Sequence, residues 1–355
     1  MTALDVRRGA LRAHARPEPG EGERRVRAIR RRDRAREVRV TLVVLVVVAA
    51  AGALALALGD YRLDPGALWS ALTGHGTALD RTVVWDLRLP RATLAVLAGA
   101  CFALAGGVFQ VLFANPLASP DILGVTGGAS VAAVAALLVL GWSGPAVSGA
   151  AFAGAACAAA VLHLVSRGRD AGQRFLLTGV GVAFLCSAVV GYLLTRSGVR
   201  QAQGALVWTV GSLGAARWGE VTVVGVALAV GTCCLAALSR RLRVLQLGEV
   251  ARGLGVPAVS RLLLVLVAVG LVGAATSVVG PVGFVALAAP PLARRSVGTG
   301  SPALVATAAT GAAIVLLADV VAQHALPGAV LPTGVVTGLV GAPYLLWLLR
   351  RGERR

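Results

Sequence analysis

Residues 92–113 read ATLAVLAGACFALAGGVFQVLF and contain no charged side chain. A helix needs roughly 20 apolar residues to cross the ~30 Å hydrocarbon core of a bilayer, so this stretch is long enough to span one. Similar apolar runs occur at 40–59, 122–141, 144–165, 174–195, 218–238, 260–279, 280–293, 302–321 and 330–349. The sequence therefore predicts an all-α integral membrane protein with about ten transmembrane helices.

Two segments are expected to be unusual. The run at 280–293 is too short to cross a bilayer alone and begins with Gly280-Pro281, which indicates a broken helix packed inside protein. A further short helix near 205–213 is predicted to lie on the outer rim.

The composition agrees with a membrane protein. Hydrophobic residues make up 57% of the chain, charged residues only 14%, and the mean hydropathy is +0.80. Soluble domains usually carry about 25% charged residues. The 45 glycines suit helices that pack closely inside a membrane, because small residues let backbones approach each other.

The net charge of +18 is concentrated at the edges of the apolar runs, and all 34 basic residues are arginine. Residues 1–39 hold thirteen arginines against six acidic residues. Because arginine accumulates on the cytoplasmic side of membranes, both termini are predicted to be cytoplasmic. We expect a disordered tail at 1–39 that contacts anionic lipid, a transmembrane domain at 40–350 and a second tail at 351–355; a nucleic-acid partner is not expected.

The motifs of common enzymes are missing from the sequence. A Walker A loop needs a lysine, and the chain has none, so any ATP must be hydrolysed by another chain. The five cysteines lie inside apolar runs without C-x-x-C spacing, which predicts no bound metal. We therefore expect a protein that is not an enzyme and holds no cofactor of its own.

Asp319 is an acidic residue near the end of a long apolar run. Ionisable groups inside a membrane often carry protons in coupled transport. A proton-driven secondary transporter that uses Asp319 is therefore an alternative, although an acid at a helix end is the simpler interpretation.

Three short segments carry features that contact with lipid does not explain. Arg88-Leu89-Pro90-Arg91 places two cations before an apolar run, where they could bind an external protein, attract an anionic solute or reach the membrane interface. The stretch from Asn115 to Asp121 contains two prolines and forms either a tight turn or a constriction at the inner mouth. Residues 247–257, within the inner segment 239–259, form either a short helix for a soluble partner or a connector.

Taken together, these segments resemble the FecCD/BtuC-like permeases, the ABC permease family that imports iron-siderophores and vitamin B12. The resemblance covers nearly all of 40–350 and is carried by an ordered set of motifs. These are LRLPR at 87–91, GVFQ at 107–110, NPLASPDILG at 115–124, LGE at 247–249, GPVGFV at 280–285, Ala318-Asp319, LPTGVVT at 331–337 and GAP at 341–343.

The resemblance implies a ten-helix subunit that forms a dimeric, BtuC-like bundle in the bacterial cytoplasmic membrane. The implied partners are a second permease subunit, two cytoplasmic ATPases that bind ATP and Mg, and an external substrate-binding protein. It implies docking of the binding protein at Arg88 and Arg91 and an inner gate formed by Asn115, Leu117, Gly172 and Gln173. It also implies a coupling helix at 248–256 that contacts the ATPase through Gly248, Glu249, Ala251, Arg252, Leu254 and Gly255.

The chain departs from the family pattern at two positions. Pro290-Pro291 stands where Pro-His is usual, and Gln323 stands where B12 permeases have an outer arginine. The pair Ala322-Gln323 is similar to catecholate-type permeases. The resemblance therefore favours a ferric-siderophore importer, with a B12 or haem importer as the alternative.

Overall fold

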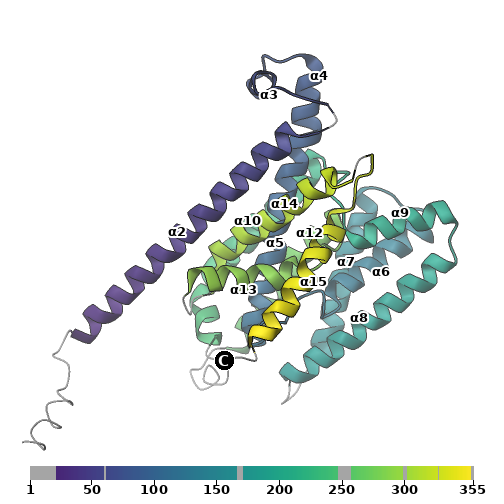
Figure 1. Cartoon of the computed structure of the whole chain (residues 1–355). Helices are drawn as coiled ribbons and strands as arrows, with labels where there is room; N and C mark the ends of the chain where they lie inside the picture. The colour runs from purple at the N-terminus through teal and green to yellow at the C-terminus, as the bar shows by residue number, and fades with distance from the viewer. Residues whose placement is uncertain are drawn as a thin grey trace, which may run out of the picture.

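The computed structural model describes residues 21–59, 61–165, 171–246, 257–298, 302–326 and 328–352. These residues form a bundle of helices (Figure 1). The elements are α2 (Glu21–Ala57), α3 (Pro65–Leu72), α4 (Ala78–Arg81), the π-helix η1 (Thr82–Arg88), α5 (Leu89–Leu112), α6 (Val125–Leu138), α7 (Pro145–Val165), α8 (Ala171–Thr195), α9 (Val199–Val210), α10 (Trp218–Leu245), α12 (Ala258–Val279), α13 (Val285–Val297), α14 (Leu304–His324) and α15 (Thr333–Gly352).

Each of the ten apolar runs contains a helix. Among the described residues, seven helical stretches are long and apolar enough to cross a membrane. They lie at Arg31–Ala57, Ala78–Leu112, Pro145–Val165, Leu177–Thr195, Trp218–Leu245, Val259–Val279 and Leu304–His324. The all-helical membrane architecture is confirmed. The count of ten crossings stays a prediction, because α6 and α13 have only 14 and 13 residues and α15 is not among the seven stretches.

The predicted break at Gly280-Pro281 is confirmed. α12 ends at Val279, and the next helix begins at Val285. Phe284, just before α13, has φ +67°, a left-handed conformation that is uncommon for a bulky residue. α9, at the end of the bundle near α3, corresponds to the short rim helix that the sequence predicts (Figure 1).

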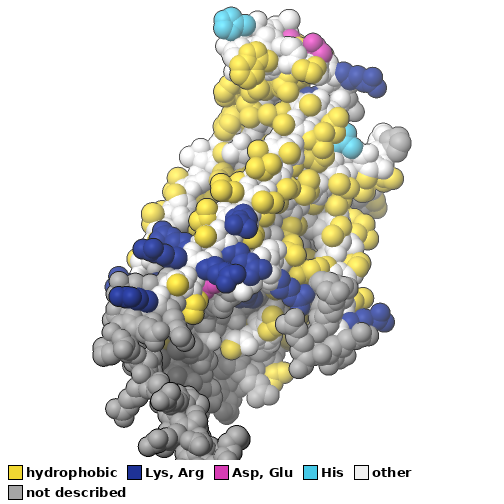
Figure 2. Space-filling view, turned by 60° about the vertical axis from the view of Figure 1, so that its left-hand side comes forward, with side chains coloured by type: hydrophobic (Ala, Val, Ile, Leu, Met, Phe, Trp, Pro, Cys, Tyr) yellow, Lys and Arg dark blue, Asp and Glu magenta, His cyan; other side chains and the backbone are white. Residues whose placement is uncertain are grey.

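α5 is the central helix of the bundle (Figure 1). Every residue from Ala98 to Leu112 is buried, and α5 contacts α2, α10, α12, α13 and α14. By contrast, α2 and α8 expose most of their apolar residues. An apolar surface covers the face that carries α2, with arginines gathered toward the end away from α3 (Figure 2). We call the two ends of the bundle the α3 end and the C-terminal end.

α2 differs from the sequence prediction at its start. It begins at Glu21, so residues 21–39, predicted to be disordered, are helical, while residues 1–20 lie outside the described part of the chain. Adding a residue to an existing helix is far easier than starting a new one, so the apolar half of α2 supports its arginine-rich half. At 37 residues the helix is about 55 Å long, well beyond the hydrocarbon thickness.

A close helix contact joins α5 and α14 through two glycines. A Cβ atom on Gly99 would overlap the backbone oxygen of Gly311, and a Cβ atom on Gly311 would overlap that of Gly99. In a membrane, such close backbone contacts hold helices together through van der Waals packing. The sequence of both helices is therefore restricted to glycine at this crossing.

We predict that Gly311→Ala destabilises the permease, because the added methyl group forces α5 and α14 apart. The expected loss in the free energy of unfolding is about 1–3 kcal/mol, the usual range for overpacking. The measurement is thermal unfolding of the detergent-solubilised protein. Gly52→Ala on α2 is the matched control, since no heavy atom lies within 4 Å of its Cβ position, and equal melting of the two variants would contradict the prediction.

Candidate functional site

A buried ion pair lies near the α3 end of the bundle. Arg91, in the first turn of α5, donates from Nε to Asp319 Oδ2 at 2.9 Å and from Nη2 to Asp319 Oδ1 at 3.0 Å. The Asp319 side chain on α14 is only 2% exposed, and that of Arg91 is 18% exposed. This parallel two-bond geometry is the strong form of an arginine–carboxylate pair.

Two further side chains complete the Asp319 cluster. Gln323, one turn later on α14, donates from Nε2 to Asp319 Oδ2 at 2.8 Å. Thr333, the first residue of α15, donates from Oγ1 to Asp319 Oδ1 at 2.8 Å. Asp319 therefore joins α5, α14 and α15, and both of its carboxylate oxygens accept bonds from within the chain.

Arg88 has a different set of partners. Its guanidinium donates to the backbone oxygens of Leu56 and Ala57 in the last turn of α2 and of Tyr61 in the following loop. The last carbonyls of a helix lack partners inside the helix, and a cation there also favours the helix dipole. Arg88 thus caps α2 and fixes the start of the α2–α3 connection.

A second polar network lies at the other end of α5. Pro290 and Pro291 have no backbone N–H, so the oxygens of Ala286 and Leu287, four residues earlier, lose their helical donors. Gln110 on α5 donates from Nε2 to Leu287 O at 3.1 Å. One turn earlier on α5, Gly106 packs so closely on α13 that a Cβ atom would overlap the oxygen of Ala286.

The same Gln110 side chain also binds a cation. Its Oε1 accepts a hydrogen bond from Nη2 of Arg294, in the last turn of α13. Gln110 is 3% exposed, so this amide is a buried link between the interior of α5 and the arginines of the C-terminal end.

The connection between α5 and α6 contains two of the predicted gate residues. Asn115 Oδ1 accepts a hydrogen bond from Leu117 N at 2.9 Å, so the Asn115 side chain shapes the turn. Ala114 before it has φ +46°, a conformation that local hydrogen bonding must hold in place. Leu117 itself is half-buried.

This connection packs against α8. A Cβ atom on Gly124 would lie 2.9 Å from the backbone N of Ala183, and one on Gly179 would lie 2.9 Å from the Cα of Leu123. Gly172 and Gln173 belong to the first turn of the same helix, but the side chain of Gln173 lies outside the described part of the structure. The connection that contains Asn115 and Leu117 thus contacts the helix that contains Gly172 and Gln173, and the gate itself stays a prediction.

One carboxyl in this connection is buried. Oδ1 of Asp121 has no hydrogen-bond partner among the described residues. Burial raises the pKa of Asp121 to about 6, and a hydrogen bond from Thr126 partly opposes the rise. The charge of this loop therefore changes just below neutral pH.

The predicted coupling residues Gly248, Glu249, Ala251, Arg252, Leu254 and Gly255 lie outside the described residues. The helices on either side of them are described. α10 ends at Leu245 and α12 begins at Ala258, and both contact α5.

Comparison with known proteins identifies the family. The model of the FecCD transport family matches residues 43–351, which is most of the chain. The chain belongs to the FecCD transport family.

Two relatives show the range within this FecCD family. The Fe(3+)-citrate import system permease protein YfmE of Bacillus subtilis is 36% identical over 303 residues, covering 84% of this chain and 90% of that protein. The hemin transport system permease protein HmuU of Yersinia pestis is 39% identical over 285 residues, covering 77% and 85%. Among solved structures, an inward-facing metal-chelate type ABC transporter matches with a TM-score of 0.77 and 28% identity, over 88% of this chain and 99% of that one.

Three residues of this FecCD chain that form hydrogen bonds in these networks were not predicted as site residues from the sequence. Gln323 and Thr333 bind Asp319, and Gln110 serves α13. For Gln110 a signal exists in the sequence, because the adjacent prolines 290 and 291 require outside donors for two carbonyls. No comparable signal exists for Thr333, whose partner lies 14 residues earlier on another helix.

We predict that Asp319→Asn destabilises the protein strongly. The variant keeps the shape of the side chain but leaves the Arg91 cation buried without its counter-charge, which typically costs about 3–5 kcal/mol. Thr333→Val removes only one hydrogen bond to a charged group, so its cost is smaller, about 1.5–3 kcal/mol. Thermal unfolding followed by circular dichroism measures both losses of stability. If the Asp319→Asn variant is as stable as the unaltered protein, the Arg91–Asp319 pair does not stabilise the fold.

Proposed function

We propose that this chain, an ABC importer permease of the FecCD family in the bacterial inner membrane, moves a ferric siderophore inward with ATP hydrolysed by two partner ATPases. We also propose that both of its termini are cytoplasmic. On this orientation the α3 end faces outward. Membership of the FecCD family argues against a proton-driven secondary transporter. The bonds of Asp319 argue against it too, because both carboxylate oxygens accept hydrogen bonds from Arg91, Gln323 and Thr333.

The neutral side chain at position 323 is the observation that supports a siderophore as the cargo. At this position the B12-type pattern has an outer arginine, whereas here the side chain is neutral and bonds inward to Asp319. The pair Ala322-Gln323 is similar to catecholate-type siderophore permeases. A haem or B12 importer remains the alternative within the same family.

The proposed coupling segment 248–256 connects two helices that touch the core. α10 and α12 pack on each other, and each packs on α5. A displacement of this segment by an ATPase would therefore reach the central helix through both neighbours. This is the physical basis on which we assign it the coupling role.

Two helices of this chain, α8 and α15, expose apolar side chains that the proposed second permease subunit could cover. α8 exposes Phe184 at 73% and Leu185 at 65%, and α15 exposes Leu339 at 68%. α8 also contacts the gate connection through Gly124 and Gly179. A pathway formed between two copies at α8 would therefore place the proposed gate residues beside it.

We further propose that the external binding protein docks on the α3 end near Arg88 and Arg91. Both guanidiniums bind within the chain, so an acidic partner would share or replace those bonds. Arg88→Glu is expected to raise the binding-protein concentration needed for half-maximal ATPase stimulation, because repulsion replaces attraction.

Arg81→Glu serves as the control for this docking test, since Arg81 is an exposed arginine at the same end. A shift in the half-maximal concentration reports docking, whereas loss of maximal stimulation at all concentrations reports damage to the α2 cap. An unchanged half-maximal concentration for Arg88→Glu would rule out docking there.

The cargo is tested by uptake into proteoliposomes that contain the permease pair, its ATPase and its binding protein. We expect ATP-dependent accumulation of a ⁵⁵Fe-labelled siderophore that persists when an uncoupler collapses the proton gradient. Haemin and labelled cobalamin, offered in parallel, should not accumulate. Preferential uptake of either competitor would exclude the siderophore assignment, and uptake without ATP would exclude the importer mechanism.

A further inference from the structure

A deep groove runs along the outside of the bundle between α7, α10 and α12. α7 and α10 both pack on α12, which forms the floor between them. The groove has a volume of about 1210 Å³. Val226 and Leu266 in its walls are 58% and 56% exposed, so the groove is open to the surroundings of the bundle.

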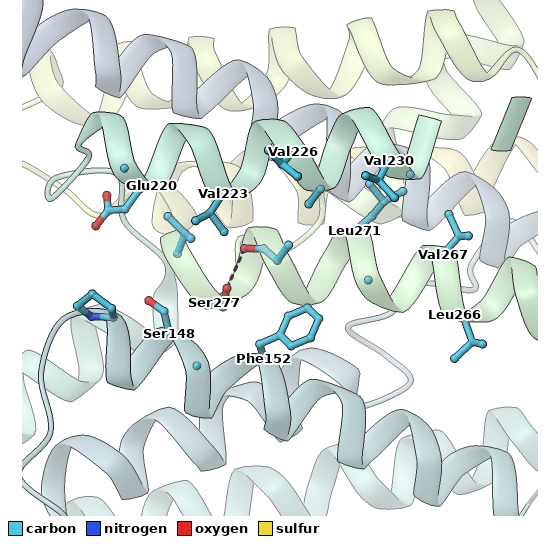
Figure 3. A pocket seen from close by; sticks show the side chains of 18 of the residues that line it. Ser148, Phe152, Glu220, Val223, Val226, Val230, Leu266, Val267, Leu271 and Ser277 are labelled. Carbon is cyan, nitrogen blue, oxygen red and sulfur yellow. Dashed lines mark hydrogen bonds between the residues drawn. The ribbon is translucent and has the colours of Figure 1, made fainter. Parts of the chain in front are cut away.

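The charged groups of the groove lie at one end. Glu220 and Ser148 line the α3 end, and Leu266 and Val267 line the opposite end (Figure 3). Arg217, just before α10, also lines the polar end. The backbone N–H of Arg217 donates to Glu220 Oε2 at 3.1 Å, which holds this carboxylate at the mouth of the groove.

Two tryptophans place the mouth at the membrane interface. Trp218 is 41% exposed and donates from Nε1 to the backbone oxygen of Trp85, and Trp142 is 47% exposed just before α7. Tryptophan concentrates at the level of lipid headgroups. The Arg217 and Glu220 side chains therefore lie where the charged part of a lipid would be.

The rest of the groove matches a hydrocarbon chain. Val223, Val230 and Phe152 line its length (Figure 3). The lining on α10 extends from Gly219 to Cys234, which is about 22 Å of helix, compared with ~15 Å for half of the hydrocarbon core. An acyl chain that enters at the headgroup level can thus lie in the groove over its full depth.

The glycines of the groove keep it open. Around Gly149 on α7 and Gly270 on α12, no heavy atom lies within 4 Å of a Cβ position. Larger side chains would fit there without touching the protein, unlike at Gly99 and Gly311 in the bundle core. Close helix packing therefore does not require glycine at these two positions.

We propose that this groove binds a phospholipid with an ammonium headgroup, of the phosphatidylethanolamine class, from the leaflet at the α3 end. The phosphate pairs with Arg217, the ammonium pairs with Glu220, and one acyl chain occupies the groove between α10 and α12. The carboxylate disfavours headgroups that carry only negative charge. The site is separate from the buried Asp319 cluster and does not depend on which cargo is transported.

The test uses the full chain in nanodiscs that contain phosphatidylethanolamine with a photoreactive acyl chain. We expect cross-linked peptides from the groove-facing parts of α10 and α12, and competition by unlabelled phosphatidylethanolamine but not by phosphatidylglycerol. Gly270→Phe should abolish this labelling because the ring occupies the groove. Gly149→Phe fills the same space from α7 and provides a second variant.

Gly52→Phe on α2 is the matched control, since its Cβ position is equally open but lies outside the groove. Arg217→Gln together with Glu220→Gln should keep the chain cross-links but remove the headgroup preference. Labelling spread evenly over the exposed faces of α2 and α8, or unchanged by Gly270→Phe, would overturn the proposal. So would equal competition by phosphatidylglycerol, or no labelling because another subunit covers the groove.

Discussion

Inside a bilayer no water is present to bond a free backbone carbonyl, so every such group needs a partner within the protein. Pro290-Pro291 leaves two carbonyls of α13 without helical donors, and α5 supplies a hydrogen-bond donor to one of them. Gln110 donates to Leu287, and Gly106 allows the two backbones to touch at Ala286. The usual family residue after the first proline is a histidine, so this chain adds a second free carbonyl. Its central helix must therefore be both narrow and able to donate a hydrogen bond.

The bundle is joined by polar groups toward its ends and by glycine contacts between them. Asp319 connects its own helix α14 to α5 and α15 near the α3 end. Gln110 and Arg294 connect α5 to α13 toward the C-terminal end. Between these networks, Gly99 and Gly311 bring α5 and α14 into backbone contact. This arrangement suits an importer whose helices move as connected units. α10 and α12 both contact α5, and α5 is attached at both networks.

The sequence located much of this site without explaining it. It singled out Arg88, Arg91 and Asp319 as charged residues that needed a reason. The docking of a binding protein at the two arginines stays a prediction, and the sequence did not predict that Arg88 caps α2 and that Arg91 pairs with Asp319. The helical half of the 1–39 segment was also missed, because its high charge resembles a disordered tail, whereas continuity with an apolar helix stabilises it.

Hydropathy and charge depend on residues that are neighbours in the sequence. The sequence alone therefore determined that this is a membrane protein, where its apolar runs lie and that arginine is concentrated near the C-terminal end of the bundle. It also carried the family motifs, because they are short and local. Pairing across the bundle was decided only by tertiary structure. Arg91 and Asp319 are 228 residues apart, and the groove between α7, α10 and α12 exists only once three separate helices have packed. A contact of this kind depends on the rotation and crossing of each helix, which no local pattern encodes.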